Sequence, residues 1–351
     1  MITKLTLLLI YIGVLVGCAG PFKYHDPKIP HRGKDGFLNN YDNSPKESVL
    51  KWYWERWTTS FPEDDPVGAP TVAVDMNAIN HPAGLAITWL GHSAMLLQMD
   101  GVNILTDPSL SERVSPFSFI GPKRYGKLPI EIEHLPAIDV VVISHNHYDH
   151  LDLPSLRKLN MLNQGKTRFL VPLGNKELLA KEGIINVAEY DWWTGEKVGA
   201  VQFTFAPAQH WTTRTRFDLN QTLWGGWMIK GATRQVYFVG DTGYSPDFRD
   251  IRQRLGAVDV ALIPIGAYAP RWFMQKQHNN PAEAVLIHQD LGAQFSLPIH
   301  WGTFKLSDEP MSEPPVKLKE ALQSANLPST VFPVLNRGET FSFEKASKQG
   351  K

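Results

Sequence analysis

Cysteine is almost absent from this chain of 351 residues. The only cysteine, Cys18, follows the apolar run 5–16 near the N-terminus. One cysteine cannot form an intrachain disulfide, and it offers no thiolate cluster for a metal. Any metal site in the body of the protein must therefore use histidine, aspartate or glutamate.

The chain also lacks net charge and any apolar run long enough to span a bilayer. Thirty-five basic residues balance 35 acidic residues, so the chain lacks the excess of basic residues that would indicate nucleic-acid binding. The apolar fraction of 43% and the charged fraction of 20% are typical of soluble globular proteins. Eleven tryptophans and 17 phenylalanines suggest an apolar or lipid-facing surface, although core packing is the simpler explanation.

The N-terminus has the pattern of a targeting segment. Lys4 precedes the apolar run 5–16, which is too short to span a bilayer, and small residues follow. The sequence Leu15-Val16-Gly17-Cys18 is typical of a bacterial lipobox. We expect residues 1–17 to be a signal peptide and Cys18 to carry a membrane anchor, with Ala19 favouring the outer membrane, facing the periplasm. The alternative is an ordinary signal peptide with an incidental cysteine.

Hydrophobic patterns divide the remaining chain into an N-terminal region (18–84), a body (85–345) and a short tail (346–351). In the N-terminal region, 21–43 reads as an extended arm and 45–57 as a helix with Ser44 as its cap. Predicted strands are 85–90, 94–99, 102–105, 139–144, 168–172, 201–206, 224–230, 235–240, 259–264, 295–299 and 331–334. Predicted helices are 153–162, 175–182, 247–255, 281–290 and 315–325. This order predicts an α/β fold of two mixed sheets covered by helices.

The stretch 143–150, Ile-Ser-His-Asn-His-Tyr-Asp-His, carries the strongest chemical signal. A short β-branched strand leads into it, and a helix with Asp152 at its cap and Pro154 in its first turn follows. His145 and His147 lie on one side of extended backbone and can bind one metal. Asp149 and His150 can serve a second metal, and this ligand chemistry suits zinc, with manganese or iron as alternatives.

Three further strands end in residues that can bind metals. His210 follows 203–206, Asp241 follows 237–240, and His300 follows 295–299. Open α/β sheets place ligands at the carboxyl ends of their strands. Each of these residues alone has an ordinary structural explanation, but together the four strand ends predict one shared site.

These motifs resemble the metallo-β-lactamase superfamily, whose fold is a four-layer αβ/βα sandwich. Within it, the chain is similar to the N-acyl-phosphatidylethanolamine-hydrolysing phospholipase D subfamily, here in a bacterial lipoprotein form. The resemblance is carried by stretches including 89–92, 105–108, 121–124, 143–152, 240–244, 263–274 and 299–304.

The resemblance implies a role for each ligand and a reaction. His145, His147 and His210 would bind one Zn²⁺, Asp149, His150 and His300 a second Zn²⁺, and Asp241 both. A hydroxide bridging the two ions would attack the phosphorus of a membrane phospholipid. Cleavage would release N-acylethanolamine and leave phosphatidic acid, with Asp149 and Asp241 counted among the catalytic groups.

Further residues are candidates for supporting roles. His278 would bind a phosphate oxygen or protonate the leaving group, or it is a loop histidine at a helix cap. Asp107 would orient a ligand histidine, or it forms a turn before proline. His92 is the remaining supporting candidate, and a structural role suits it best. The substrate-binding candidates lie in aromatic and basic loops: Lys123, Arg124, Tyr268, Arg271 and Trp272.

Two other functions remain open from the sequence. One is a dizinc hydrolase of another ester or phosphodiester, such as a lactone or a cyclic nucleotide. The other is a non-catalytic envelope lipoprotein on the same fold, which the complete ligand set disfavours. The family resemblance alone suggests a homodimer.

Overall fold

The computed structural model describes residues 22–44, 47–58 and 68–343. The expectations for the signal peptide, for Cys18 and for the C-terminal tail fall outside these residues. Among the described residues, no helix is both long enough and apolar enough to cross a membrane.

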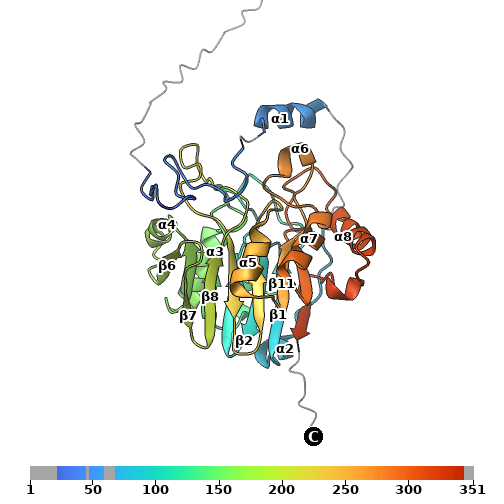
Figure 1. The fold of residues 1–351 in the computed structure, drawn as a ribbon. Coiled ribbons are helices and arrows are strands. Elements are labelled where there is room, and N and C mark those ends of the chain that lie inside the picture. Colours follow the sequence, from blue (N-terminus) through green and yellow to red (C-terminus); the bar gives the residue numbers. More distant parts are fainter. Residues whose placement is uncertain (1–21, 45–46, 59–67, 344–351) are drawn as a thin grey trace, which may run out of the picture.

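Two mixed β-sheets form the centre of the molecule (Figure 1). The seven-stranded sheet has the order β13-β1-β2-β3-β4-β5-β6, and its strands are β1 (Leu85–Gly91), β2 (Ala94–Met99), β3 (Val102–Thr106), β4 (Val140–Val142), β5 (Arg168–Pro172), β6 (Val187–Tyr190) and β13 (Thr340–Phe343). The six-stranded sheet has the order β12-β11-β10-β9-β8-β7, and its strands are β7 (Gly195–Val198), β8 (Val201–Ala206), β9 (Gly226–Lys230), β10 (Gln235–Phe238), β11 (Val260–Pro264) and β12 (Phe295–Ile299).

Each sheet combines an antiparallel part with a parallel part. Strands β1 to β3 pair as an antiparallel meander, and β3 to β6 then run parallel. In the second sheet, β7 to β10 are antiparallel, and β10 to β12 are parallel. The parallel strands direct their carboxyl ends to one end of the molecule, where the loops with the predicted ligands begin.

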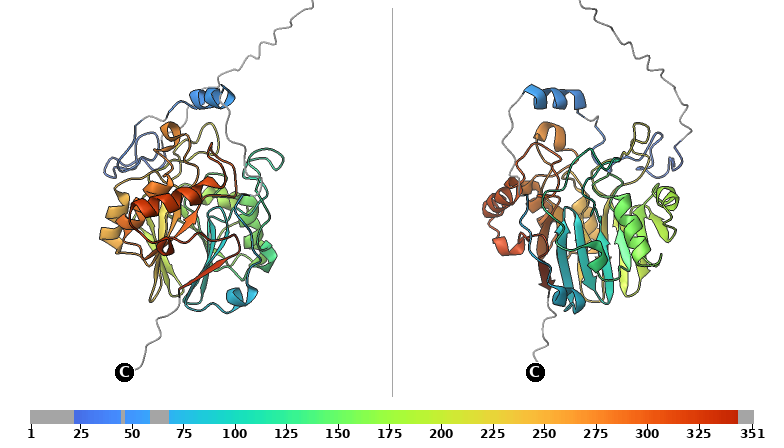
Figure 2. Two further views of the ribbon diagram at one scale, coloured as in Figure 1. Left: turned by 90° about the vertical axis from the view of Figure 1, so that its right-hand side faces the viewer. Right: turned by 180° about the vertical axis from the view of Figure 1, so that it is seen from behind.

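The alternation of side chains along the strands produces the four layers. On β4, Val140 and Val142 pack in the core between the sheets, while Val141 packs in a second core on the outer face. Helices α2 (Met76–Asn80), α3 (Leu153–Leu162) and α4 (Lys176–Lys181) cover the outer face of the seven-stranded sheet. Helices α5 (Asp247–Leu255), α7 (Pro281–Leu291) and α8 (Glu313–Ser324) flank the other sheet (Figure 2). The predicted fold class is therefore confirmed.

The C-terminal strand was predicted at the wrong place. The structure has a short 3-10 helix at Ser329–Val331, and the strand that completes the sheet is β13. Proline has no amide hydrogen to donate, so Pro328 and Pro333 disfavour a paired strand over 331–334. A 3-10 helix also lies at Ile132–His134. The short strands β6 and β7 were not predicted from the sequence.

The N-terminal region packs onto the end of the body that carries the predicted site. Phe37 of the arm is fully buried. Helix α1 (Val49–Thr58) lies beside the short helix α6 (Arg271–Met274) in every view (Figures 1 and 2). The hydroxyl of Ser48, rather than that of Ser44, accepts a hydrogen bond from the first turn of α1 at Lys51 (3.2 Å). The Trp52 ring stacks on Phe273 at a centroid distance of 5.1 Å.

Candidate metal centre

Asp107, which follows β3, holds the start of the loop after β4 by hydrogen bonds. The Asp107 carboxylate accepts hydrogen bonds from the Ser144 amide (2.7 Å) and hydroxyl (2.5 Å). The loop then turns sharply, because the His150 amide donates to the His147 carbonyl (3.1 Å). Together these contacts place the histidines of the loop at the end of both sheets.

Several loops at this end hold non-glycine residues in the left-handed region of backbone conformation. His92 after β1 has a φ of 54°, Asp107 a φ of 31°, and His300 after β12 a φ of 59°. Such conformations are unfavourable for residues with a Cβ, and they cluster at functional sites. The His300 amide donates to the His92 carbonyl (3.1 Å), so these two strained turns support each other across the sheets.

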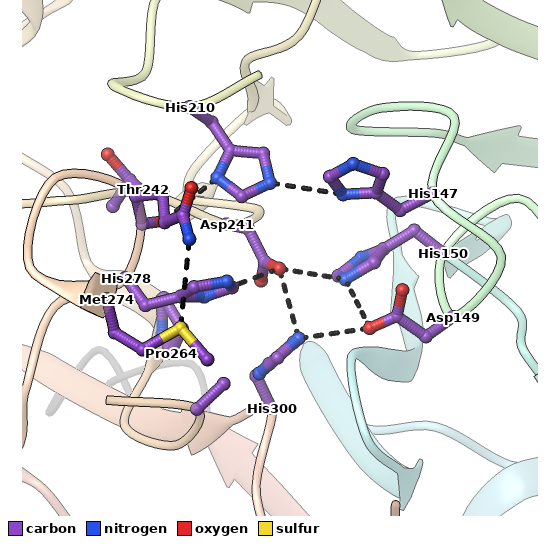
Figure 3. Close-up of polar contacts among 12 residues, drawn as sticks. His147, Asp149, His150, His210, Asp241, Thr242, Pro264, Met274, His278 and His300 are labelled. Atoms are coloured by element: carbon purple, nitrogen blue, oxygen red, sulfur yellow. Dashed lines mark hydrogen bonds and ion pairs between the residues drawn. The ribbon is translucent and has the colours of Figure 1, made fainter. Parts of the chain in front are cut away.

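Three histidines, His145, His147 and His210, bring their ring nitrogens together in the first group of the site. Figure 3 shows two of them, His147 and His210. His145 Nε2 lies 2.9 Å from His147 Nδ1, and His210 Nε2 lies 3.3 Å from the same His147 nitrogen. Two loops from different sheets therefore direct three imidazole nitrogens at one point. This is the arrangement of ligands around an ion.

A second group lies beside the first and is built from Asp149, His150 and His300. The Nε2 atoms of His150 and His300 each lie 3.3 Å from Asp149 Oδ2. They also lie 3.1 Å and 3.0 Å from Asp241 Oδ2. Asp241 is close to His210 of the first group as well, so its carboxylate stands between the two groups (Figure 3).

Burial keeps the first group neutral. It holds the pKa of His145 and of His210 well below the usual range, and neighbouring imidazoles lower them further. Burial lowers the pKa of His147 to about 3. A histidine must be neutral to bind a metal, so this group is ready to bind one without losing protons.

The second group carries charge. Burial opposes protonation of His300, but Asp241 and Asp149 outweigh it and raise the pKa of His300 to about 9. The same carboxylates raise the pKa of His150 well above its usual range. Burial also opposes ionisation of Asp241, yet His150 and His300 hold its pKa well below the usual range. Protons on these imidazoles balance the carboxylates, and a bound cation would replace them.

Contacts outside the two groups fix the orientation of the rings. Asp107 Oδ2 lies 2.6 Å from His150 Nδ1, which leaves His150 Nε2 to face the centre. His92 Nε2 lies 3.0 Å from Asp149 Oδ2, and burial lowers the pKa of His92 to about 3. These are the geometries expected of residues that orient metal ligands.

The residues present fit a pair of metal ions. Asp241 Oδ1 is buried and has no hydrogen-bond partner within the described chain, although buried carboxylate oxygens normally have one. The ring nitrogens of the first group face one another, where hydrogen bonds could satisfy only some of them. Nitrogen and oxygen donors without thiolate suit zinc, and they also accept manganese or iron.

His278 reaches the same centre from the loop before α7. Its Nδ1 lies 3.7 Å from Asp241 Oδ2, and burial lowers its pKa to about 4, so the ring is neutral at pH 7. Arg271 donates to the His278 carbonyl (2.8 Å) and is itself paired with Glu283 (2.8 Å). Glu283 also closes a capping box with Asn280 at the start of α7. These hydrogen bonds and the ion pair fix the loop that carries His278 to the start of α7.

A cavity of about 550 Å³ opens onto the metal centre. Its floor includes His147, Asp149, Asp241 and His278. Its walls are mainly apolar and are formed by Trp52, Val114, Tyr148, Trp211, Leu219, Ala267, Phe273, Met274 and Leu306. Glu47 and Lys276, whose charged atoms lie 3.6 Å apart, also contact it. The arrangement suits a substrate with an apolar part above a polar reacting group.

Two residues that we expected to bind substrate, Lys123 and Arg124, have other positions. Lys123 is exposed and pairs with Glu112 (2.9 Å). Arg124 is buried, donates to the carbonyls of Ser109 and Ser111, and lies over the Phe304 ring. Neither side chain lines the cavity, and Arg124 instead ties together the loop after β3.

The other three expected substrate-binding residues are also in contact with protein rather than with the cavity. The Tyr268 hydroxyl donates to Glu313, and Arg271 supports His278 as described above. The Trp272 indole nitrogen donates to Glu55 of α1 (3.0 Å), and Lys51 lies 4.1 Å from its ring centroid. In the structure these side chains hold α1 and the His278 loop in place, and their role in substrate binding stays a prediction.

Sequence reasoning missed most of the cavity wall. Trp52 is on α1 and Val114 is in the loop after β3, both distant in sequence from the metal ligands, and Leu219 is in the loop that follows His210. Their only signal in the sequence is an apolar side chain in a loop or on a helix, and many core residues share it.

The comparisons with known proteins agree with this fold and site. Residues 102–301 match the family model described as the beta-lactamase superfamily domain, and the chain belongs to this family. It is 39% identical over 282 residues to N-acyl-phosphatidylethanolamine-hydrolyzing phospholipase D 1 of Caenorhabditis elegans, which covers 77% of this chain and 79% of that protein.

Two further comparisons extend the relationship. A metal-dependent hydrolase of Methanopyrus kandleri is 30% identical over 263 residues, covering 73% of this chain and 99% of that protein. The crystal structure of a possible metal-dependent hydrolase from Veillonella parvula has a TM-score of 0.60 at 18% identity, covering 74% of this chain and all of that chain, and so supports the fold alone. The protein is a metal-dependent hydrolase on the metallo-β-lactamase fold.

Proposed function

We propose that this protein is a dizinc phospholipase D that hydrolyses N-acylated phosphatidylethanolamine to N-acylethanolamine and phosphatidic acid. The observation that carries the proposal is the apolar cavity directly above the metal centre. A phospholipid needs both features, because its phosphodiester must reach the ions while acyl chains stay out of water. The identity to a phospholipase D of this type supports the same choice of substrate.

The ligand assignment follows the two groups of side chains. His145, His147 and His210 would hold one zinc ion, and Asp149, His150 and His300 would hold the other. Asp241 would contact both ions. When bound, such a pair activates water near neutral pH and screens the charge on phosphoryl oxygens.

The chain's own residues position the substrate and handle the proton. Water adds its oxygen to phosphorus, the bond from phosphorus to the ethanolamine oxygen breaks, and one proton passes from water to the leaving alkoxide. The neutral His278 ring, beside Asp241, is placed to donate a hydrogen bond to a phosphoryl oxygen or to the leaving oxygen. The apolar walls exclude bulk water, which strengthens each polar contact on the floor.

The rim of the cavity supports contact with a lipid surface. Next to Trp52, Val114 and Leu219, which line the cavity, the same segments expose large apolar side chains. These are Leu50 and Trp54 of α1, Phe117, Phe119 and Ile120 of the loop after β3, and Phe217. We infer that this rim faces the membrane, and that a lipid on Cys18 holds the protein at the periplasmic side of the outer membrane. Apolar side chains that enter the boundary between headgroups and acyl chains would add to the affinity that the anchor provides.

The test is product analysis by mass spectrometry in water enriched in oxygen-18. Purified protein would be mixed with vesicles containing N-acyl-phosphatidylethanolamine, with and without a chelator. We expect N-acylethanolamine without label and phosphatidic acid with one labelled oxygen, and no products with the chelator.

Two results would contradict the proposal. Label in the N-acylethanolamine would mean that a different bond breaks. Activity on lactones or cyclic nucleotides, with none on the lipid, would favour a different substrate for the same hydrolase.

A further inference from the structure

The N-terminal arm reaches a predicted metal ligand. The side chain of Asn39 contacts the backbone of His210 on both sides of its Cα. Asn39 Oδ1 accepts a hydrogen bond from the His210 amide (3.0 Å), and Asn39 Nδ2 donates to the His210 carbonyl (3.1 Å). A single carboxamide therefore fixes the two peptide groups that flank this histidine.

The orientation of the Asn39 amide is determined by a third contact. The Trp224 indole nitrogen, which can only donate, lies 2.9 Å from Asn39 Oδ1. The backbone of Asn39 is held in turn by Asn43, whose Oδ1 accepts from the Asn39 amide and whose Nδ2 donates to the Asn39 carbonyl, both at 2.7 Å. These contacts hold the Asn39 carboxamide in its orientation independently of its hydrogen bonds to His210.

The ring of His210 is held separately from its backbone. His210 Nδ1 lies 2.8 Å from the Gln277 carbonyl, which directs Nε2 toward His147. Two bonds to the backbone and one to the ring leave the imidazole little freedom. Neither Asn39 nor its neighbours in the arm lie in the stretch 102–301 that matches the family model.

We propose that Asn39 is a positioning residue of the metal centre, and that the arm thereby completes the site that holds the ion bound by His145, His147 and His210. Other contacts also attach the arm to the body. Phe37 is fully buried, Arg32 pairs with Asp191 (2.6 Å), and Asn40 donates to Asp247 (2.8 Å). Replacement of Asn39 should therefore disturb the ligand more than the attachment of the arm.

The experiment compares Asn39→Ala with Asn40→Ala. The two changes are chemically identical and adjacent, but Asn40 contacts α5 and no predicted ligand. Zinc affinity of the full chain, stripped of metal, would be measured by competition with a chromophoric chelator, and the cobalt form would be compared by its visible spectrum. Thermal unfolding would be recorded with and without zinc.

We expect Asn39→Ala to bind one of two zinc ions about 10- to 100-fold more weakly, the range for loss of a contact that orients a ligand. The cobalt spectrum and the zinc-induced rise in unfolding temperature should change with it. Asn40→Ala should keep its affinity within about twofold. Asn39→Asp keeps the acceptor oxygens, so its zinc affinity should lie between those of Asn39→Ala and the unchanged protein. If Asn39→Ala does not fold, the zinc affinity of Asn39→Asp tests the proposal in its place.

Two results would overturn the proposal. One is an Asn39 variant that binds both ions with unchanged affinity and spectrum. The other is an equal loss in Asn40→Ala, which would assign the effect to docking of the arm as a whole. Both outcomes concern metal binding, so they are independent of which ester the protein hydrolyses.

Discussion

The floor and the wall of the cavity are built in different ways. The floor consists of charged and polar side chains from the loops after β4, β8, β10 and β12, together with His278 from the loop before α7, and these side chains are buried or half-buried. The wall consists of apolar side chains from α1, α6 and five loops, with exposed apolar residues at its rim. Strand ends fix the floor by backbone geometry, whereas side-chain packing between distant segments fixes the wall.

This difference has consequences for chemistry. A floor mounted on strand ends keeps its ligands in place, which catalysis by bound metals requires. A wall made of helix and loop segments can change its shape and still exclude water. Substitutions in the floor should therefore affect metal binding and every substrate alike, whereas substitutions in the wall should affect substrates according to their apolar parts.

The largest expected effect comes from Asp241→Asn in the floor. It removes a carboxylate charge shared by His150 and His300, so we expect activity to fall by about 10³-fold, the scale seen when an electrostatic partner of the transition state is lost. Metal content by elemental analysis should fall as well. Asp259→Asn is a matched control, because Asp259 pairs with Arg234 at the opposite end of the same sheet. Equal activity in both variants would contradict the assignment.

A smaller loss is expected from Asp107→Ala below the floor. Asp107 holds His150 Nδ1 and the Ser144 amide, so its loss should weaken metal binding by about 10- to 100-fold. Chelator competition measures the affinity, and circular dichroism of the metal-free protein checks that the fold persists. Unchanged affinity would show that His150 is oriented without Asp107.

The pH dependence separates the two groups of the floor. The pKa of His300 is raised to about 9, so the apo protein gains stability from this proton that is complete below pH 6.5 and is lost as pH rises through 9. A metal must displace this proton and the proton on His150, so affinity for the ion held by the second group should rise by about 10- to 100-fold per pH unit below that pKa. Calorimetry in buffers of different ionisation enthalpy would detect the released proton. Affinity that is independent of pH between 6 and 8 would contradict this.

The smallest effect is expected from Trp52→Ala in the wall. Trp52 lines the cavity, and loss of one aromatic contact with an acyl chain, worth about 0.5–1.5 kcal/mol, should raise KM for a long-chain lipid by about 2- to 10-fold. A short-chain substrate should be hydrolysed at the normal rate. Trp54→Ala on the same helix, whose side chain is exposed, should leave KM for dispersed monomers unchanged. An equal loss for both chain lengths would mean that Trp52 supports the floor instead.

The sequence was informative where local rules apply. The strand at β4 and the turn after it follow from β-branched residues succeeded by polar ones, and the helix α3 follows from Asp152 and Pro154. Arg124 shows the limit of such reasoning. A basic residue in a loop with aromatic neighbours has the same sequence pattern whether its side chain contacts a substrate or the protein. Arg124 contacts two backbone carbonyls and the Phe304 ring.

The sequence by itself determined the two sheets, the ends at which the polar residues emerge and the chemistry of those residues. Alternating side chains and strand-ending turns are local properties, so they can be read along the chain. Only the tertiary structure decided that Trp52 of α1 forms part of the cavity wall and packs on Phe273. It also decided that Asn39 donates a hydrogen bond to the backbone of His210, and that Arg271 donates one to the backbone of His278. These contacts join segments far apart in sequence, and their energy depends on packing and burial that no local pattern contains.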